Sequence, residues 1–242
     1  MVRFRSMVLF IIYCVVVICL TGAAVIITGK TADRDQALSA FDRDWSCEGY
    51  ESVSLDALPV PADGESITIS KILPESLDSK EQLNLIGNNI YFDVAIDDDV
   101  IYSYHPAENL TGKGYGNQIH YIAIPNGGRV VSITYTPIYK NDSSATIQSV
   151  YIGSEEAYIS MIFRDRGPQF YLSILMIFLG LFSMVMALGS YGLKASIYNL
   201  PAMAFSILML GIWTSLKSLI PQLFYDNVIL LRMIDYSCLT FV

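Results

Sequence analysis

Charged residues are scarce in this chain, and so are the residues from which most metal sites are built. Asp, Glu, Lys and Arg make up 16% of the 242 residues, against about 25% in a typical soluble domain. The four cysteines form no C-x-x-C pattern, and this argues against a cysteine-rich zinc site. No cluster of Lys and Arg occurs, although a surface that binds nucleic acid needs one. We therefore expect no metal, no cofactor and no nucleic-acid partner.

The cysteines themselves lie mostly in apolar sequence. Cys14, Cys19 and Cys238 fall within apolar runs, and Cys47 is alone in the more polar part of the chain. A half-buried, unreactive residue is the simpler interpretation of Cys47, and a pairing or redox role is the alternative.

Long apolar runs are what the chain has in abundance. Residues 7–28 contain no charge, and a run of about 20 apolar residues can cross a bilayer. The run exceeds the apolar part of a cleaved signal peptide, about 7–15 residues, so we interpret it as an uncleaved anchor. Residues 170–193, 200–220 and 228–242 predict three more transmembrane helices, with Pro168 at the start of the first. Because the last run is too short for a full crossing, we expect further chain beyond it.

Charge around these runs predicts a multi-pass topology in the cell membrane. Arg3 and Arg5 lie in the short segment 1–6 before the anchor, which the positive-inside rule keeps in the cytoplasm. Residues 29–169 are then extracytoplasmic. The stretch 30–169 carries 21 acidic and 10 basic residues, a net charge of −11. An acidic soluble domain is therefore expected between membrane segments, with the lipid bilayer as the first partner.

The extracytoplasmic segment shows the alternation that is typical of β-strands. "NIYFDVAID" places Ile90, Phe92, Val94 and Ile96 on one face, and "VIYSY" follows an acidic tip at residues 97–99, so this pair predicts a hairpin. Similar runs separated by turn-forming residues predict an all-β, jelly-roll-like sandwich joined to transmembrane α-helices. "DQALSAFDRDW", residues 35–45, is expected to form a short helix near the membrane.

A glycine-rich stretch, "AENLTGKGYGNQIHY", covers residues 107–121. A phosphate-binding loop needs G-x-x-x-x-G-K-[ST] between a strand and a helix, and a dinucleotide fingerprint needs G-x-G-x-x-G. Here Gly112, Gly114 and Gly116 alternate, no Ser or Thr follows Lys113, and a strand comes next. The glycines are expected to supply positive φ in a long connection between strands.

Aromatic residues and histidines give the candidate ligand site. No nucleophile motif such as G-x-S-x-G is present, so we expect no enzyme activity in this chain. Tyr102, Tyr104, His105, Tyr115 and His120 are the candidate binding residues, although ordinary strand preference also explains the tyrosines. The acids at 97–99 could bind calcium, but Asp is also favoured in tight turns.

Charged residues inside the apolar runs form a second candidate site. Arg232 and Asp235 lie three apart, which places them on one helical face where they can pair. The pair is either an intramembrane packing or signalling contact or an interfacial one. Lys217 lies near a helix end, where it can extend toward water.

The order of these parts resembles the sensory region of bacterial membrane receptors with diverse intracellular signalling modules. The likeness is nearest to the membrane-bound diguanylate cyclases (GGDEF proteins) of Firmicutes. It is carried by "SITISKILP", "YFDVAIDDDVIYSY", "GKGYGNQIHYIAIP", "VSITYTPIY", "VYIGS", "GIWTSLKS" and "LLRMIDYSCL".

The resemblance implies an external jelly roll that binds carbohydrate or another small ligand. It also implies helices that pass the signal to a C-terminal output domain. The GGDEF signature is missing from this chain, so no cyclase residue is assigned. A membrane-anchored accessory or scaffold protein, whose β domain binds another protein, is the alternative; an external enzyme lacks a constellation to support it. A homodimer is a further expected partner state.

Overall fold

The computed structural model describes residues 38–47, 50–59, 61, 65–75, 77, 80–105, 116–125, 127, 129–139, 142–191, 200–225 and 228–240. The predicted anchor at 7–28, the segment 1–6 and Tyr115 lie outside these residues. The chain divides into two compact units. Gln36–Ile159 forms one, called here the sandwich unit, and Ser160–Val242 belongs to the other, called here the helical unit.

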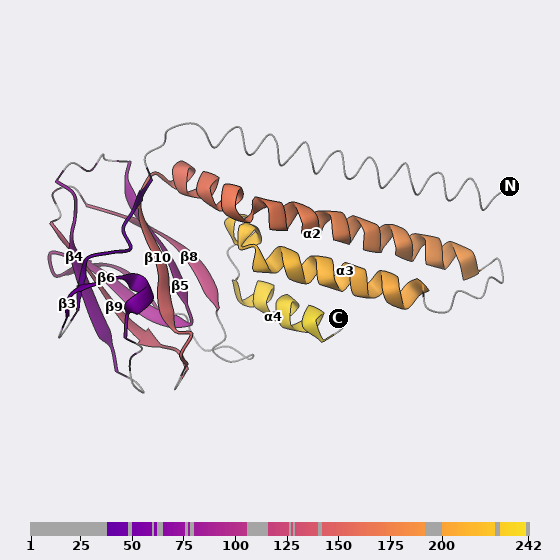
Figure 1. The fold of residues 1–242 in the computed structure, drawn as a ribbon, viewed down its shortest axis with the longest axis horizontal. Helices are drawn as coiled ribbons and strands as arrows, with labels where there is room; N and C mark the ends of the chain where they lie inside the picture. Colours follow the sequence, from indigo (N-terminus) through magenta and orange to yellow (C-terminus); the bar gives the residue numbers. More distant parts are fainter. Residues whose placement is uncertain are drawn as a thin grey trace. The chain divides into compact units, whose positions relative to one another are not determined.

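The sandwich unit consists of two antiparallel sheets (Figure 1). In the first sheet the strand order is β1-β10-β5-β8, and in the second it is β3-β2-β4-β9-β6-β7. The strands are β1 (Ser39–Ala40), β2 (Trp45–Cys47), β3 (Tyr50–Val53), β4 (Ile67–Ile72), β5 (Gln82–Asn88), β6 (Ile90–Ile96), β7 (Asp99–Tyr104), β8 (Asn117–Ala123), β9 (Val130–Pro137) and β10 (Thr146–Gly153), with a 3-10 turn η1 (Leu55–Ala57). Two antiparallel sheets with helices agree with the coarse fold predicted from the sequence.

The strand pairs are nested along the chain. β1 pairs with β10, β4 with β9, β5 with β8, and β6 with β7. Each pair encloses the next, so the innermost pair is a simple hairpin. Its two-residue turn is formed by Asp97 and Asp98, at φ 49° and 71°, the positive values that such hairpin turns require.

Alternation explains which residues form the core. Along β6, Ile90, Phe92, Val94 and Ile96 are buried, and the residues between them are half-buried. These side chains meet those of the facing sheet, because successive strand residues point to opposite faces. The fully buried Trp45 belongs to the same core.

The expected helix at 35–45 is wrong in the part that the structure describes. Ser39 and Ala40 form β1, and β2 begins at Trp45. Phe41 and Trp45 have helical spacing, but both are buried and their rings meet edge to face at 5.4 Å. The indole N–H of Trp45 donates to the carbonyl of Phe41 at 2.8 Å. Core burial of two large rings thus outweighs local helical preference.

The helices are α2 (Glu155–Tyr191), α3 (Leu200–Lys217) and α4 (Val228–Leu239), with a 3-10 turn η2 (Ile220–Leu223) before α4. α2 begins at Glu155, and not at Pro168 as the sequence analysis expected. The amide of Ala157 donates to the hydroxyl of Ser154 at 3.2 Å, which caps the helix, and Glu155 and Glu156 favour its first turn electrostatically. Pro168 lies inside α2.

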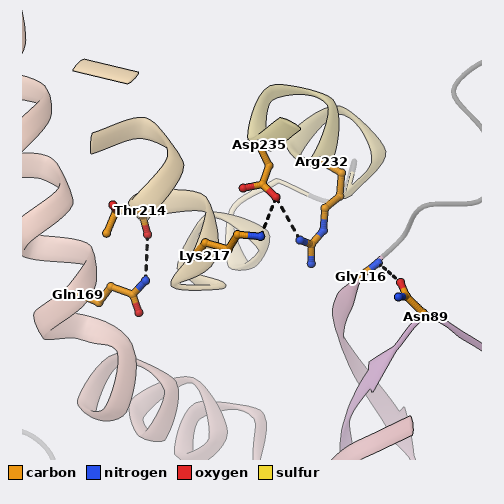
Figure 2. A network of polar contacts seen from close by, with 7 residues as sticks. All are labelled: Asn89, Gly116, Gln169, Thr214, Lys217, Arg232 and Asp235. Atoms are coloured by element: carbon orange, nitrogen blue, oxygen red, sulfur yellow. Dashed lines mark hydrogen bonds and ion pairs between the residues drawn. The ribbon is translucent and has the colours of Figure 1, made fainter. Parts of the chain in front are cut away.

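Two glycines bring α2 and α3 into close contact. A Cβ on Gly180 would lie 2.7 Å from the amide nitrogen of Leu208, and one on Gly211 would lie 2.8 Å from that of Ile177. Small residues of this kind let helix backbones approach closely. The side-chain amide of Gln169 also donates to the carbonyl of Thr214 at 3.2 Å (Figure 2).

Among the described helices, one passes the criteria of length and composition for crossing a membrane. It covers Glu155–Ala187, and the mean hydropathy of its most apolar window is 2.3. The apolar helix Pro201–Lys217 is shorter. Along α2, the side chains of Phe178, Leu181 and Val185 are exposed.

Candidate functional site

A cluster of rings lies between the edge strands of the two sheets. β7 ends the second sheet and β8 ends the first. The imidazole of His120 on β8 meets the rings of Tyr104, Phe92 and Tyr102 at centroid distances of 4.5, 4.8 and 5.8 Å. The hydroxyl of Tyr102 and Nδ1 of His120 share a hydrogen bond of 3.0 Å. The structure therefore brings Tyr102, Tyr104 and His120 together from strands of different sheets.

Two buried side-chain nitrogen atoms on this face of β8 have no hydrogen-bond partner among the described residues. His120 is 7% exposed and Gln118, two residues earlier on the same strand face, is 4% exposed. Nε2 of each has no hydrogen-bond partner among the described residues. Buried polar atoms are normally paired, so each nitrogen leaves unused capacity for a hydrogen bond. Burial also lowers the pKa of His120 to about 4, and the imidazole is neutral near pH 7.

The other two predicted binding residues are not in this cluster. His105 lies on the outer side of the second sheet, where its ring stacks on Tyr91 at 5.6 Å and Nε2 lies 2.9 Å from Asp93 Oδ1. Partial burial opposes it, but hydrogen bonds from Ser103 and His105 lower the pKa of Asp93. Tyr115 lies outside the described residues.

A cleft of about 590 Å³ opens at one end of the sandwich unit. It lies where β4 ends and where β8 leads toward β9. Its lining comprises Ile72, Leu73, Pro74, Glu75, Leu77, Glu81, Ile124, Pro125, Gly127 and Arg129. Small-molecule sites usually enclose about 300–1,000 Å³, so the volume suits a small ligand.

The acidic tip of the hairpin is used within the fold. The carboxylate of Asp97 accepts hydrogen bonds from the amides of Arg129, at 3.2 and 3.1 Å, and of Val130, at 2.9 Å. Those bonds favour the turn interpretation over calcium binding. In the part of the chain that the structure describes, no group of three or more His, Cys, Asp or Glu could hold a metal ion.

The end of the glycine-rich connection is also described. Gly116 has φ 58°, and its amide donates to Oδ1 of Asn89 at 2.7 Å (Figure 2). Positive φ is the conformation for which glycine was expected here. Gly112, Gly114 and Lys113 lie outside the described residues.

Charged side chains from the last residue of α3 and from the interior of α4 meet (Figure 2). Nζ of Lys217 lies 2.9 Å from Oδ2 of Asp235, and Nη1 of Arg232 lies 3.4 Å from the same oxygen. Asp235 is 2% exposed, and Oδ1 has no hydrogen-bond partner among the described residues. Arg232 and Asp235, paired in the sequence analysis, are in contact, and Lys217 is the nearer cation.

The chain matches no protein-family model, and comparisons with curated proteins and with solved structures give no match either.

Sequence reasoning missed Gln118, Phe92, the cleft and the role of Lys217. Gln118 was accessible to it, because a polar residue two positions from His120 shares its strand face. The same alternation separates His105 from Tyr104, since neighbouring strand residues point apart. The cleft and the Lys217 contact join distant parts of the sequence, and no local pattern reports them.

Proposed function

We propose that this chain is the sensory part of a membrane receptor. The sandwich unit binds a small extracellular ligand, and the helices pass the signal to a cytoplasmic output domain that follows them. The resemblance in sequence makes a diguanylate cyclase the expected output. Tyr102, Tyr104 and His120 belong to the ligand-responsive part of the sandwich.

One contact carries the proposal. β8 presents His120 to the ring cluster and Tyr121, its neighbour, to the opposite face of the sheet. There the ring of Tyr121 meets Tyr158, in the first turns of α2, at 5.9 Å, and Tyr151 of β10 meets the same ring at 5.9 Å. Tyr158 is fully buried. A displacement of β8 by a ligand therefore acts directly on the start of α2.

The Tyr121 side chain can transmit a displacement by packing, because its hydroxyl is uncharged. Burial and the nearby charge of Glu155 raise its pKa to about 12, which keeps it neutral. The following residues of the same strand lead to Ile124 and the cleft. β8 thus contacts the ring cluster and α2, and the residue that follows it, Ile124, lines the cleft.

The nested strand pairs support a jelly-roll assignment for the sandwich. Taking β1 and β4–β10 as the first to the eighth strand, the pairs are first with eighth, second with seventh, third with sixth, and fourth with fifth. An antiparallel ribbon rolled onto itself gives this order, and ligand-binding lectins use such a double-sheet architecture.

Membrane insertion is part of the same proposal. The apolar window of α2 and the exposed side chains of Phe178, Leu181 and Val185 suit contact with lipid. We place the helices in the cell membrane as a multi-pass protein, with residues 1–6 in the cytoplasm and 29–169 outside.

The test uses the full chain in lipid nanodiscs. A panel of sugars, amino acids, peptides and metabolites is screened by thermal shift, and the amide exchange of residues 155–168 is then measured with each hit. We expect the ligand to slow exchange in this part of α2. Tyr121→Leu should keep the binding and reduce the exchange response, whereas Tyr91→Leu, on the other sheet, should change neither.

Two results would contradict the proposal in different ways. A broad panel without any thermal shift removes direct ligand sensing, and a protein partner recovered on the sandwich would then favour the accessory-protein alternative. A ligand that binds without altering exchange in α2, or a full response in Tyr121→Leu, removes the relay through β8.

A further inference from the structure

The cleft at the end of β4 and β8 is apolar at its base and charged at its rim. Leu73 is buried in the sandwich core, and Leu77 and Ile124 are partly buried against it. Ile72 lies on the rim of the cleft and is 74% exposed. A large apolar side chain so open to water gains from being covered, so the cleft favours a ligand with an apolar part.

Two opposite charges line the cleft without a partner. Neither the carboxylate of Glu75 nor the guanidinium of Arg129 has a hydrogen bond or ion pair with the described residues. Other carboxylates at or beside the cleft are engaged: Glu81, also in the lining, has an interaction of its own, and Asp97 accepts from main-chain amides. Glu75 and Arg129 are thus available to a ligand.

Arg129 stands on a fixed base. Its amide donates to both carboxylate oxygens of Asp97, and its carbonyl accepts from the amide of Leu73 at 2.8 Å. These bonds join the loop that carries Arg129 to the hairpin tip and to the end of β4. A guanidinium on a fixed main chain loses less conformational freedom on binding a carboxylate.

The charge of the whole segment adds a constraint. Residues 30–169 carry a net charge of −11, which repels a purely anionic ligand and attracts one with an ammonium group. A ligand with both charges satisfies Arg129 and Glu75 together, and a neutral sugar satisfies neither by charge.

We propose that the cleft binds a free amino acid with an apolar side chain. Its carboxylate pairs with Arg129, its ammonium group with Glu75, and its side chain lies on Leu73, Leu77 and Ile124. The inference rests on the proposed sensory function, for which it names the ligand class.

The experiment measures binding to the full chain in nanodiscs by isothermal titration calorimetry. Leucine is compared with leucinamide, which lacks the carboxylate, with N-acetylleucine, which lacks the ammonium group, and with glucose. Leucine should bind most tightly, because leucinamide and N-acetylleucine each lose one charge-assisted hydrogen bond. Glucose carries neither charge and should not bind.

Two variants connect each ligand group to its residue. Arg129→Gln should weaken the binding of leucine by about tenfold, the loss expected for one charge-assisted contact. The affinity for leucinamide should not change. Glu75→Gln should weaken leucine similarly and leave N-acetylleucine unchanged. Arg43→Gln and Glu65→Gln, exposed positions outside the cleft lining, are the matched controls and should bind leucine as the parent does.

The outcomes separate this inference from the receptor proposal. No binding of leucine, or equal losses for leucine and leucinamide in Arg129→Gln, overturns the amino-acid site. If glucose or another panel compound then binds and alters α2, the receptor proposal stands without it. If leucine binds as expected and α2 does not respond, the cleft assignment holds and the relay falls.

Discussion

The ammonium group of Lys217, the last residue of α3, lies 2.9 Å from the carboxylate of Asp235 in α4. Arg232 approaches the same oxygen at 3.4 Å. The carboxylate is almost completely buried, while the Lys217 side chain is 40% exposed. One carboxylate thus contacts two cations and joins the C-terminal end of α3 to the interior of α4.

Asp235→Asn should therefore destabilise the contact between α3 and α4. The substitution removes the carboxylate that Lys217 and Arg232 share, and loss of a hydrogen bond to a charged group typically costs about 1.5–3 kcal/mol. The buried thiol of Cys238 in α4 reports the opening. In a variant whose other cysteines are replaced, we expect Cys238 to react with a thiol dye at lower temperature.

Asp165→Asn is the matched control. Asp165 pairs with Arg164, and both side chains are more than half exposed, so the loss should be at most about 1 kcal/mol. Adding Lys217→Met to Asp235→Asn should recover part of the stability, because it removes one uncompensated cation. Equal melting of Asp235→Asn and Asp165→Asn would show that the buried pair contributes no stability.

The close contact of α2 and α3 gives a second prediction. Gly180→Ala should lower the melting temperature in detergent, because its Cβ would meet the backbone of Leu208 at 2.7–2.8 Å. Overpacking of this kind costs about 1–3 kcal/mol. In Gly167→Ala the new Cβ meets a tyrosine ring atom at 3.3 Å, which can move. That control should melt unchanged or higher, since alanine favours helix by about 1 kcal/mol. If both variants melted at a higher temperature than the parent, the close approach of α2 and α3 at Gly180 would not limit the size of the side chain there.

The pH dependence of the sandwich unit should reflect His120. Its pKa is about 4 in the folded state, below an ordinary value of about 6.5, so the unfolded chain takes up the proton first. The contribution of His120 to the free energy of unfolding is fully present above about pH 6.5. It decreases as the pH falls to about 4 and does not change below that pH. The loss is about 3 kcal/mol.

Denaturant unfolding followed by fluorescence of the buried Trp45 measures this loss, in a Trp213→Phe background. His120→Phe should flatten the decline between pH 4 and 6.5. His105→Gln, at the exposed histidine paired with Asp93, should retain it. A decline that persists in His120→Phe would assign it to another group.

The proposed topology makes Cys47 accessible from outside the cell. Its side chain is half-buried at the end of β2, and Cys238 is buried. A membrane-impermeant maleimide should label intact cells expressing the chain, and Cys47→Ser should lose the label. Labelling that appears only after the cells are lysed would place the sandwich unit on the cytoplasmic side.

The sequence predicts the strands well because a strand with one buried face alternates apolar and polar residues. Ile90, Phe92, Val94 and Ile96 are buried as their spacing indicates, and the hairpin at Asp97 and Asp98 follows from turn chemistry. Alternation does not report which strands become neighbours. The meeting of Tyr102 with His120 depends on the edges of two sheets, and the contact of Lys217 with Asp235 depends on helix packing.

The start of α2 is a different case, since the signal was local. Ser154, Glu155 and Glu156 form a capping sequence, but the hydropathy of the later segment drew the predicted start toward Pro168. The described part of residues 35–45 shows the reverse. A helix was expected there, whereas burial of the Phe41 and Trp45 rings in the core decided the structure.

The pairing of β1 with β10 has a consequence for how this protein could be rebuilt. Ser39 lies opposite Ile152 and Ala40 opposite Tyr151, so the chain enters and leaves the sandwich on adjacent strands, about 4.8 Å apart. A domain whose two ends lie close together can be inserted into, or removed from, a longer chain with little disturbance of the flanking segments. Another domain with neighbouring ends could be spliced between the same flanking segments, and α2 would then receive a different input.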